Sequence, residues 1–425
     1  MKSKVLILIN NAYETNSSDF IEIIQMFLLN DIKVHLVIAK AERPLDEFYK
    51  KKGIEIEILS SHSNERGSLT FLKNIVRNNK IICNVCCYLL ALAQNIIFKY
   101  KYEDAPDKER FAVRTFLTQE MLQYVPKEEY DYIWVHDEIG LIWAQNMKKE
   151  YQIKWPIIHH CIELYWEHFL LQKRRKIVYY NQYILFEHAR EALKNVDLVV
   201  IQDGARWNVL CEYTGISEKR HVFFPVSLYD YVLNKEESAA ESKIIYYPTM
   251  IAAKRGCIEL IEMFENVKTV GFELEIHGIH ADPGYMKQLS KLKLSDNVIL
   301  SNCAMSYSDL LDKHRQIWCV FIYYGEDDYN DKYVVNSSNK IAMALQAGKP
   351  IIAIGNHLIS ELCKEYGCGI ALGKWDADEF RQAVSELDKD YTAFCQRAKK
   401  CFEERYNASK FYANILDGMM EVNCD

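Results

Sequence analysis

The segment SNKIAMALQAGKPIIAI (residues 338–354) contains the two patterns that alternate along most of this 425-residue chain. Serine and asparagine at 337–339 are typical of a helix start, and the pattern that follows predicts a helix over residues 339–347. The unbroken apolar run 350–354 predicts a parallel strand covered on both faces. A helix followed by such a strand is the repeating unit of a doubly wound α/β sheet.

The same alternation extends outward from this segment in both directions. A polar stretch at 226–242 interrupts it and predicts a linker between two series. The predicted strands are 5–9, 34–38, 54–59, 132–135, 156–159 and 198–202 before the linker, and 243–247, 273–277, 297–300, 317–323 and 350–354 after it. The predicted helices are 19–29 in the first series, and 257–265, 283–293, 307–313, 339–347, 358–366 and 376–386 in the second.

We therefore expect an α/β protein with two doubly wound, Rossmann-like domains that face each other across a cleft. The predicted boundaries are 1–225 for the first domain, 226–242 for the linker and 243–405 for the second domain. A C-terminal helix, 406–425, is expected to pack back on the first domain. Ligands in such sheets bind beyond the carboxyl ends of the strands, which is where we look for chemistry.

Composition excludes several classes of protein. The formal net charge of −7 argues against general nucleic-acid binding, so no nucleic-acid partner is expected. The 13 cysteines are scattered without a repeating frame, and no histidine–cysteine cluster has zinc spacing, so we expect reduced thiols, a cytoplasmic protein and no metal. The first apolar run, 5–9, is too short for a signal peptide.

Cations precede or begin two helices of the second series. Lys254, Arg255 and Gly256 come just before the predicted helix 257–265, and Lys340 lies in the first turn of the helix that Asn339 begins. A cation at a helix N-terminus faces the positive end of the helix dipole, whereas a phosphate is stabilised there. Solvated loop charges and a simple N-cap explain each cluster alone. The two clusters together, each after a strand of one predicted sheet, favour a diphosphate site.

These residues resemble the GT-B glycosyltransferases, in particular the retaining family-4 group. The segment 338–352 resembles the family's PNKLFEYMAAGKPVI, and RGCIELIE (255–262) resembles its loop and helix with the pattern (K/R)G…ELIEA. Smaller matches are IHG (276–278), DNVIL (296–300) and GCGI (367–370) in the second domain, and WVHD (134–137) and IHHCIELY (158–165) in the first.

The resemblance implies a GT-B fold and transfer of a sugar from a nucleotide-diphosphate sugar to a glycan or lipid-linked acceptor, with no further cofactor. Lys254, Arg255, Gly256, Asn339 and Lys340 would hold the diphosphate. His277 and Gly278, where a predicted strand ends, would approach the nucleotide. In the acceptor-side domain the candidate catalytic residues are His136, Asp137 and Glu163, with His160 as a further candidate.

The sequence also departs from the family. Its paired glutamates fall on Val335 and Met343, which cannot accept a hydrogen bond from a sugar hydroxyl, and Glu326 would replace them only if its loop folds back. The glycine-rich loop after the first strand is absent. Asp376 and Asp378 form a nominal DxD that we interpret as a helix cap. Asp327, Asp328 and Asp331 are expected to form a solvated acidic loop, and Gly367 a helix C-cap.

Two basic segments bear on location. Residues 66–110 mix apolar side chains with lysines and arginines, which is typical either of a surface that docks on anionic lipid or of a buried helix with charged ends. The run KRRK (173–176) would add to the same surface. We expect a cytoplasmic protein, peripheral on the inner face of a membrane, that builds a surface polysaccharide. A nucleotide-sugar epimerase of the same fold and a non-catalytic, degenerate subunit remain alternatives.

Overall fold

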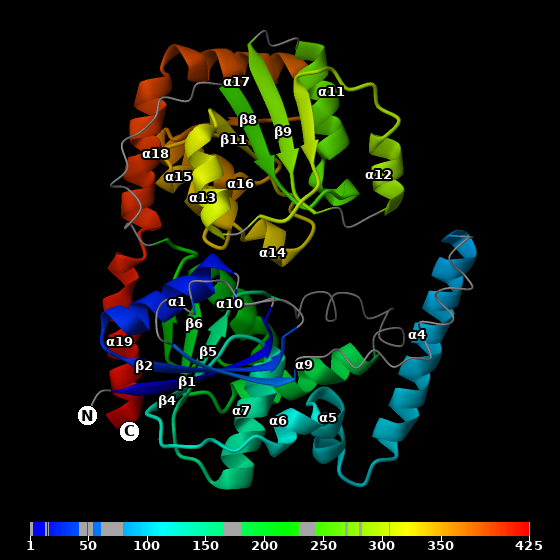
Figure 1. Ribbon diagram of the computed structural model, residues 1–425, viewed down its shortest axis with the longest axis vertical. Helices are drawn as coiled ribbons and strands as arrows, with labels where there is room; N and C mark the ends of the chain where they lie inside the picture. Colours follow the sequence, from blue (N-terminus) through cyan, green and yellow to red (C-terminus); the bar gives the residue numbers. More distant parts are fainter. Residues whose placement is uncertain are drawn as a thin grey trace. The chain divides into compact units, whose positions relative to one another are not determined.

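The computed structural model describes residues 3–12, 15, 17–41, 49, 54–60, 80–164, 180–228, 243–267, 271–279, 283–305 and 307–424. The chain divides into two compact units. Unit 1 comprises Met1–Phe223 together with Asn414–Asp425, and unit 2 comprises Phe224–Ala413. Each unit is built around one parallel β-sheet with helices on both faces, as Figure 1 shows for the two units separately.

Within the described residues, unit 1 has a seven-stranded sheet in the order β3-β2-β1-β4-β5-β6-β7, with every neighbouring pair parallel. Its strands are β1 (Lys4–Asn11), β2 (Lys33–Lys40), β3 (Glu55–Ser60), β4 (Tyr132–Val135), β5 (Ile157–Cys161), β6 (Leu198–Ile201) and β7 (His221–Phe223). Its helices are α1 (Ser18–Leu29), α4 (Lys80–Glu103), α5 (Lys108–Phe116), α6 (Gln119–Gln123), α7 (Glu138–Tyr151), α9 (Tyr180–Leu193) and α10 (Gly204–Thr214).

Unit 2 has a six-stranded parallel sheet, counted over the same described ranges, in the order β10-β9-β8-β11-β12-β13. The strands are β8 (Lys243–Pro248), β9 (Phe272–His277), β10 (Val298–Ser301), β11 (Cys319–Tyr323), β12 (Ile351–Ile354) and β13 (Gly369–Leu372). A 3-10 turn, η4 (Ala253–Arg255), precedes the helices α11 (Cys257–Val267), α12 (Pro283–Leu289), α13 (Tyr307–Gln316), α14 (Tyr329–Lys332), α15 (Asn339–Gln346), α16 (His357–Tyr366), α17 (Ala377–Lys389), α18 (Tyr391–Arg405) and α19 (Ser409–Cys424).

The unbroken apolar strands of unit 2 follow from a core on each face of the sheet. Alternate residues of one strand enter different cores: Tyr247 and Phe321 join one cluster, and Tyr246 and Val320 join the other. Helices α11 and α17 pack with the first cluster, and α15, α16 and α18 with the second. Because neither face is solvated at the centre of the sheet, an alternating pattern would bury polar side chains there, and the central strands β11 and β12 are apolar.

The predicted fold class, α/β with two doubly wound Rossmann-like sheets, is confirmed. The predicted linker lies largely outside the described residues, as does the run KRRK. Two strands were missed, β7 and β13, because both are short edge strands with partly exposed residues. The last turns of α19 belong to unit 1, where Arg220 lies 3.7 Å from Glu421. In the described parts of the chain, no helix is long and apolar enough to cross a membrane.

Two smaller predictions about helix ends are also confirmed. Gly367 is the C-cap of α16 and adopts the left-handed conformation, with φ of 63°. Asp376 is the N-cap of α17, where its carboxylate accepts hydrogen bonds from the backbone N–H groups of Asp378 and Glu379. The nominal DxD motif is therefore a helix cap, and its acidic residues are used in starting a helix.

Candidate functional site

Each sheet has one point at which the strand order reverses, and the candidate residues gather at these two points. In unit 2 the order reverses between β8 and β11, and in unit 1 between β1 and β4. Loops that leave adjacent strands in opposite directions at such a point open a crevice beyond the carboxyl ends of the strands.

Lys340 lies at the switch point of unit 2. Ser338 caps α15 by accepting a hydrogen bond from the backbone N–H of Ile341, which places Lys340 in the first turn as predicted. The Lys340 ammonium lies 3.4 Å from the Thr249 hydroxyl, beyond the end of β8, and 4.8 Å from the centre of the Tyr324 ring, beyond the end of β11. Burial lowers the pKa of Lys340, and the neighbouring charge of Arg255 lowers it further.

Arg255 contacts the same aromatic ring. Its guanidinium lies 5.0 Å from the centre of the Tyr324 ring and is 3.1 Å from both carboxylate oxygens of Asp331. The side chains of Arg255 and Asp331 are each only 13% exposed. Both cations therefore converge on Tyr324, and neither points away into bulk water.

The carboxylates do not balance the two cations. Asp331 pairs with Arg255, whereas Lys340 has no carboxylate at ion-pair distance among the residues that the structure describes. An unpaired ammonium is costly to bury, and an anion that meets both side chains would offset that cost. Of the two positive charges, that of Lys340 is left without a carboxylate partner among the described residues.

The prediction that Asp327, Asp328 and Asp331 form a solvated loop is wrong for two of them. Asp328 is the N-cap of the short helix α14, and it accepts a hydrogen bond of 2.7 Å from the backbone N–H of Asp331. That turn directs the Asp331 side chain to Arg255. Asn356 holds the same helix by donating to the carbonyl oxygens of Asp331 and Lys332.

Two glycines, Gly256 and Gly278, allow close backbone packing next to Arg255 and Thr249. Gly256 has φ of 62°, and a Cβ there would lie 2.6 Å from a ring carbon of Trp375. At Gly278 a Cβ would lie 1.8 Å from the backbone oxygen of Thr249, so the end of β9 touches the chain leaving β8. These contacts fix the backbone next to Arg255 and Thr249, and any larger residue would displace it.

The other predicted nucleotide-binding residues have different surroundings. Lys254 is exposed, and Asn339 forms the first residue of α15. His277 is buried, with Nδ1 at 2.6 Å from the Tyr246 hydroxyl and Nε2 at 3.5 Å from the Cys303 sulfur. Burial lowers its pKa. The structure thus joins Lys340 and Arg255 but gives His277 its own set of partners.

The positions of the family's paired glutamates belong to the core. Val335 and Met343 are both buried in the cluster on the α15 face of the sheet. Glu326 accepts a hydrogen bond of 2.7 Å from the backbone N–H of His357 and lies 2.5 Å from the ring Nδ1 of the same residue. Glu326 is therefore used at the start of α16.

The switch point of unit 1 holds a buried group that sequence reasoning found only in part. His136 follows β4, His160 lies in β5, and Asp19 lies in the first turn of α1. His136 Nε2 is 3.9 Å from Asp19 Oδ2, and the two imidazole rings are 4.9 Å apart, centre to centre. Burial lowers the pKa of His136 and brings that of His160 to about 3, so both rings are neutral. Burial raises the pKa of Asp19.

The remaining candidates of unit 1 lie beside this group. Asp137 is the N-cap of α7 and accepts a hydrogen bond from the backbone N–H of Gly140. Glu163 follows β5, and burial lowers the pKa of the nearby Arg206 guanidinium while the charge of Glu163 partly opposes that shift. Glu138 was not predicted, and burial together with the charge of Asp137 raises its pKa to about 8.

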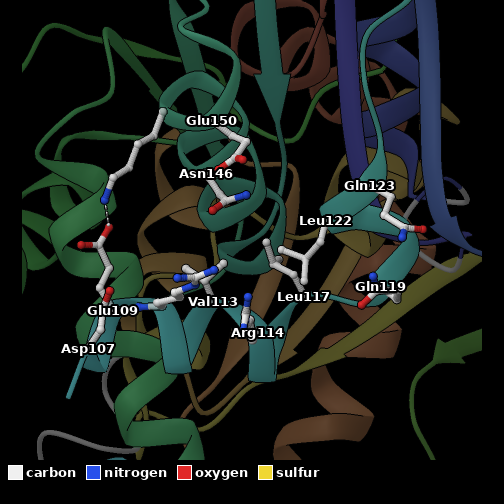
Figure 2. Close-up of a pocket in the computed structure, with 12 residues that line it drawn as sticks. Asp107, Glu109, Val113, Arg114, Leu117, Gln119, Leu122, Gln123, Asn146 and Glu150 are labelled. Carbon is white, nitrogen blue, oxygen red and sulfur yellow. Dashed lines mark hydrogen bonds and ion pairs between the residues drawn. The ribbon is translucent and has the colours of Figure 1, made fainter. Parts of the chain in front are cut away.

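A separate hollow of about 830 Å³ lies at the other end of α7 (Figure 2). It is lined by α5, α6 and the last turns of α7, and its side chains combine both charge signs. Among the described residues, none of the predicted site residues lines it. We therefore assign it no part in the candidate site.

Comparison with solved structures identifies the fold. HepE from Anabaena, solved in complex with UDP-glucose, is 14% identical over 98% of this chain and 99% of its own, with a TM-score of 0.58. Sucrose-phosphate synthase from Thermosynechococcus elongatus is 10% identical over 99% of both chains, with a TM-score of 0.62. A UDP-forming α,α-trehalose-phosphate synthase from Burkholderia vietnamiensis is 10% identical over 99% of this chain and 100% of its own, with a TM-score of 0.60.

No protein-family model and no curated protein sequence matches the chain. The structural neighbours are GT-B glycosyltransferases, and the chain shares their GT-B fold of two Rossmann-like domains.

Proposed function

We propose that this chain is a glycosyltransferase that moves a sugar from a nucleotide-diphosphate sugar to a glycan or lipid-linked acceptor. The observation that carries the proposal is the convergence of Lys340 and Arg255 on Tyr324 at the switch point of unit 2. HepE, which shares the fold, has been solved with UDP and with UDP-glucose, and this supports a nucleotide-sugar donor. A UDP-sugar is therefore the first donor to test.

The two cations have a defined task in this reaction. As the bond between the anomeric carbon and the diphosphate breaks, negative charge grows on the β-phosphate. Fixed positive groups that meet this charge in a site with little water stabilise the transition state more than the ground state. Arg255 exchanges Asp331 for phosphate oxygens, and Lys340 gains its first anionic partner. On this account the diphosphate needs no metal ion, and transfer proceeds with retention of configuration, as the family-4 resemblance implies.

Unit 1 supplies the acceptor side. His136 follows β4, and its Nδ1 has no hydrogen-bond partner among the described residues, so we assign this nitrogen to a sugar hydroxyl of the acceptor. Glu163, at the end of β5, is the carboxylate we assign to acceptor binding, and Asp137 supports the site by holding the first turn of α7.

We further propose that the acceptor is presented at the cytoplasmic face of a membrane during surface polysaccharide synthesis. Helix α4 carries exposed apolar side chains at Leu89, Ile96, Ile97 and Tyr100, spaced so that they share one face. Lys101 lies in the last turn of the same helix. Apolar side chains beside lysines are typical of a helix that lies in the interface of an anionic membrane. Residues 66–79, the first part of the basic segment 66–110, lie outside the described residues.

Vesicle binding tests the membrane proposal. The purified protein should sediment with vesicles that contain anionic phospholipid, and the bound fraction should fall as salt rises, because lysine attraction is screened. The double variant Leu89→Asp, Ile97→Asp should bind several-fold less. Val125→Asp, which changes an exposed apolar residue elsewhere in unit 1, should bind as the wild type does. Equal binding by both variants would contradict the assignment to α4.

Product analysis tests the proposed reaction. A thermal-shift screen of nucleotide-sugars should find donors that raise the melting temperature, since a ligand that binds the folded state stabilises it. Incubation of such a donor with lipid-linked and soluble acceptors should give a sugar-extended acceptor and a nucleoside diphosphate. An isomerised donor with no transfer would identify an epimerase instead. The buried Val335 and Met343 favour one other candidate, a non-catalytic subunit, and failure of every nucleoside diphosphate to bind would support it.

A further inference from the structure

We propose that unit 1 contains a site for a first-row divalent metal ion, formed by Asp19, His136 and His160. One ligand atom from each of these residues lies within 4.8 Å of the other two. The residues come from α1, the end of β4 and β5, which follow or form three adjacent strands of the sheet. Their sequence separation is why no ligand spacing predicted this site, and why the chain was expected to hold no metal.

The three side chains are buried, and in two of them one polar atom has no hydrogen-bond partner among the described residues. Asp19 is 2% exposed, His136 7% and His160 1%. In the part of the chain that the structure describes, Asp19 Oδ2 and His136 Nδ1 accept or donate no hydrogen bond. The 3.9 Å between His136 Nε2 and Asp19 Oδ2 is too long for a hydrogen bond but fits two ligands on either side of one ion. A buried carboxylate oxygen with no partner is costly, and a metal ion would supply its partner.

The rings are held in place by packing. His136 meets the Phe20 ring edge-on, with centres 5.3 Å apart, and His160 meets the Trp134 ring in the same way at 5.7 Å. These contacts limit ring rotation, so the imidazole nitrogens keep their directions before an ion arrives. Ligand groups fixed in this way lose little conformational entropy on binding.

The donor set selects the class of metal. Two imidazoles and one carboxylate suit zinc, manganese or ferrous iron, whereas calcium and magnesium favour sites made of oxygen atoms. Three protein ligands leave coordination positions for water or for a hydroxyl group of a bound molecule. A metal at such a position lowers the pKa of that hydroxyl. The site is independent of the diphosphate proposal, because Lys340 and Arg255 belong to unit 2.

Metal binding by the full-length protein tests the site directly. Protein stripped with chelator and then loaded with Zn²⁺ or Co²⁺ should retain one equivalent after gel filtration, measured by mass spectrometry of the metal. The Co²⁺ form should show visible absorption bands of nitrogen and oxygen coordination. Failure of the wild-type chain to retain either ion would overturn the proposal, whatever the variants do.

Variants then locate the ion. Asp19→Asn and His160→Gln should each weaken binding by ~100-fold or more, since loss of even an outer-shell partner costs 10- to 100-fold. His221→Gln, which changes a histidine of unit 1 that stacks on Trp207, is the matched control and should bind as the wild type does. Melting curves of the stripped proteins show whether each variant is folded. Unchanged affinity in a folded His136→Ala, His160→Gln double variant would place the ion elsewhere and contradict the assignment.

Discussion

Replacing Lys340 with alanine should lower the rate of sugar transfer by about 10²- to 10³-fold, the usual cost of removing one fixed group that stabilises developing negative charge. The ammonium lies 3.4 Å from the Thr249 hydroxyl and 4.8 Å from the centre of the Tyr324 ring. The loss should appear in kcat as well as in kcat/KM, because the charge on the β-phosphate is largest in the transition state.

The folded state should tolerate this substitution. Lys340 has no carboxylate partner among the described residues, so alanine breaks no ion pair and removes a partly buried charge whose pKa burial already lowers. We expect a melting temperature within a few degrees of the wild type. Lys374→Ala removes an exposed lysine of the same unit and serves as the matched control. If Lys340→Ala transferred sugar at nearly the wild-type rate, both at saturating and at limiting donor concentration, the phosphate role of Lys340 would be wrongly assigned.

Replacing Gly278 with alanine should damage both the stability of unit 2 and its binding of nucleoside diphosphates. The added Cβ would lie 1.8 Å from the backbone oxygen of Thr249, and a backbone atom cannot swing aside as a flexible side chain can. Overpacking of this kind costs ~1–3 kcal/mol. In a unit of this size that corresponds to roughly 2–10 °C in melting temperature. The displaced residue, Thr249, is the hydrogen-bond partner of Lys340, so the proposed anion site would be displaced with it.

Calorimetry measures the melting temperature of Gly278→Ala, and titration with nucleoside diphosphates measures its affinity. Gly325→Ala is the control, because a Cβ there meets no atom closer than 3.6 Å and that glycine has no positive φ. The control should retain both the melting temperature and the affinity of the wild type. If Gly278→Ala behaved as Gly325→Ala does, the close passage of β9 against the chain leaving β8 would not matter for the site.

Most of the fold was accessible from the sequence because its signals are local. An unbroken apolar run such as residues 132–135 needs no knowledge of its neighbours, and β4 spans the same residues. Strands β7 and β13 were missed for the opposite reason. Three or four partly exposed residues at a sheet edge carry little hydrophobic signal, and only their pairing with β6 and β12 makes them strands.

The residues of the candidate site also differ in how far local sequence predicts them. Lys340 was predicted from its own helix start, which is local information. Its partners Thr249 and Tyr324 were not predicted, because they meet only where β8 and β11 pair. Asp331 was misjudged since a four-residue helix, α14, turns its side chain onto Arg255. Asp19 was overlooked for a comparable reason, since only the fold brings α1 to the ends of β4 and β5.

The substitutions at the family's glutamate positions also have a physical outcome. Val335 and Met343 are buried, so these positions now contribute to packing and cannot contact a ribose through a carboxylate. Any nucleotide selectivity must then come from other groups near the ends of β8 and β9. The two cations that we assign to phosphate binding, Lys340 and Arg255, are retained in this sequence.

The assignment of Arg255 and Lys340 to a diphosphate is tested most directly by calorimetric titration with UDP, GDP, ADP and CDP. The wild type is compared with an Arg255→Ala, Lys340→Ala double variant. We predict that at least one nucleoside diphosphate binds the wild type with one-to-one stoichiometry and that the folded double variant loses this binding by at least about 100-fold. If no nucleoside diphosphate bound the wild type, or if the folded double variant kept the same affinity, the two cations would not form a diphosphate site.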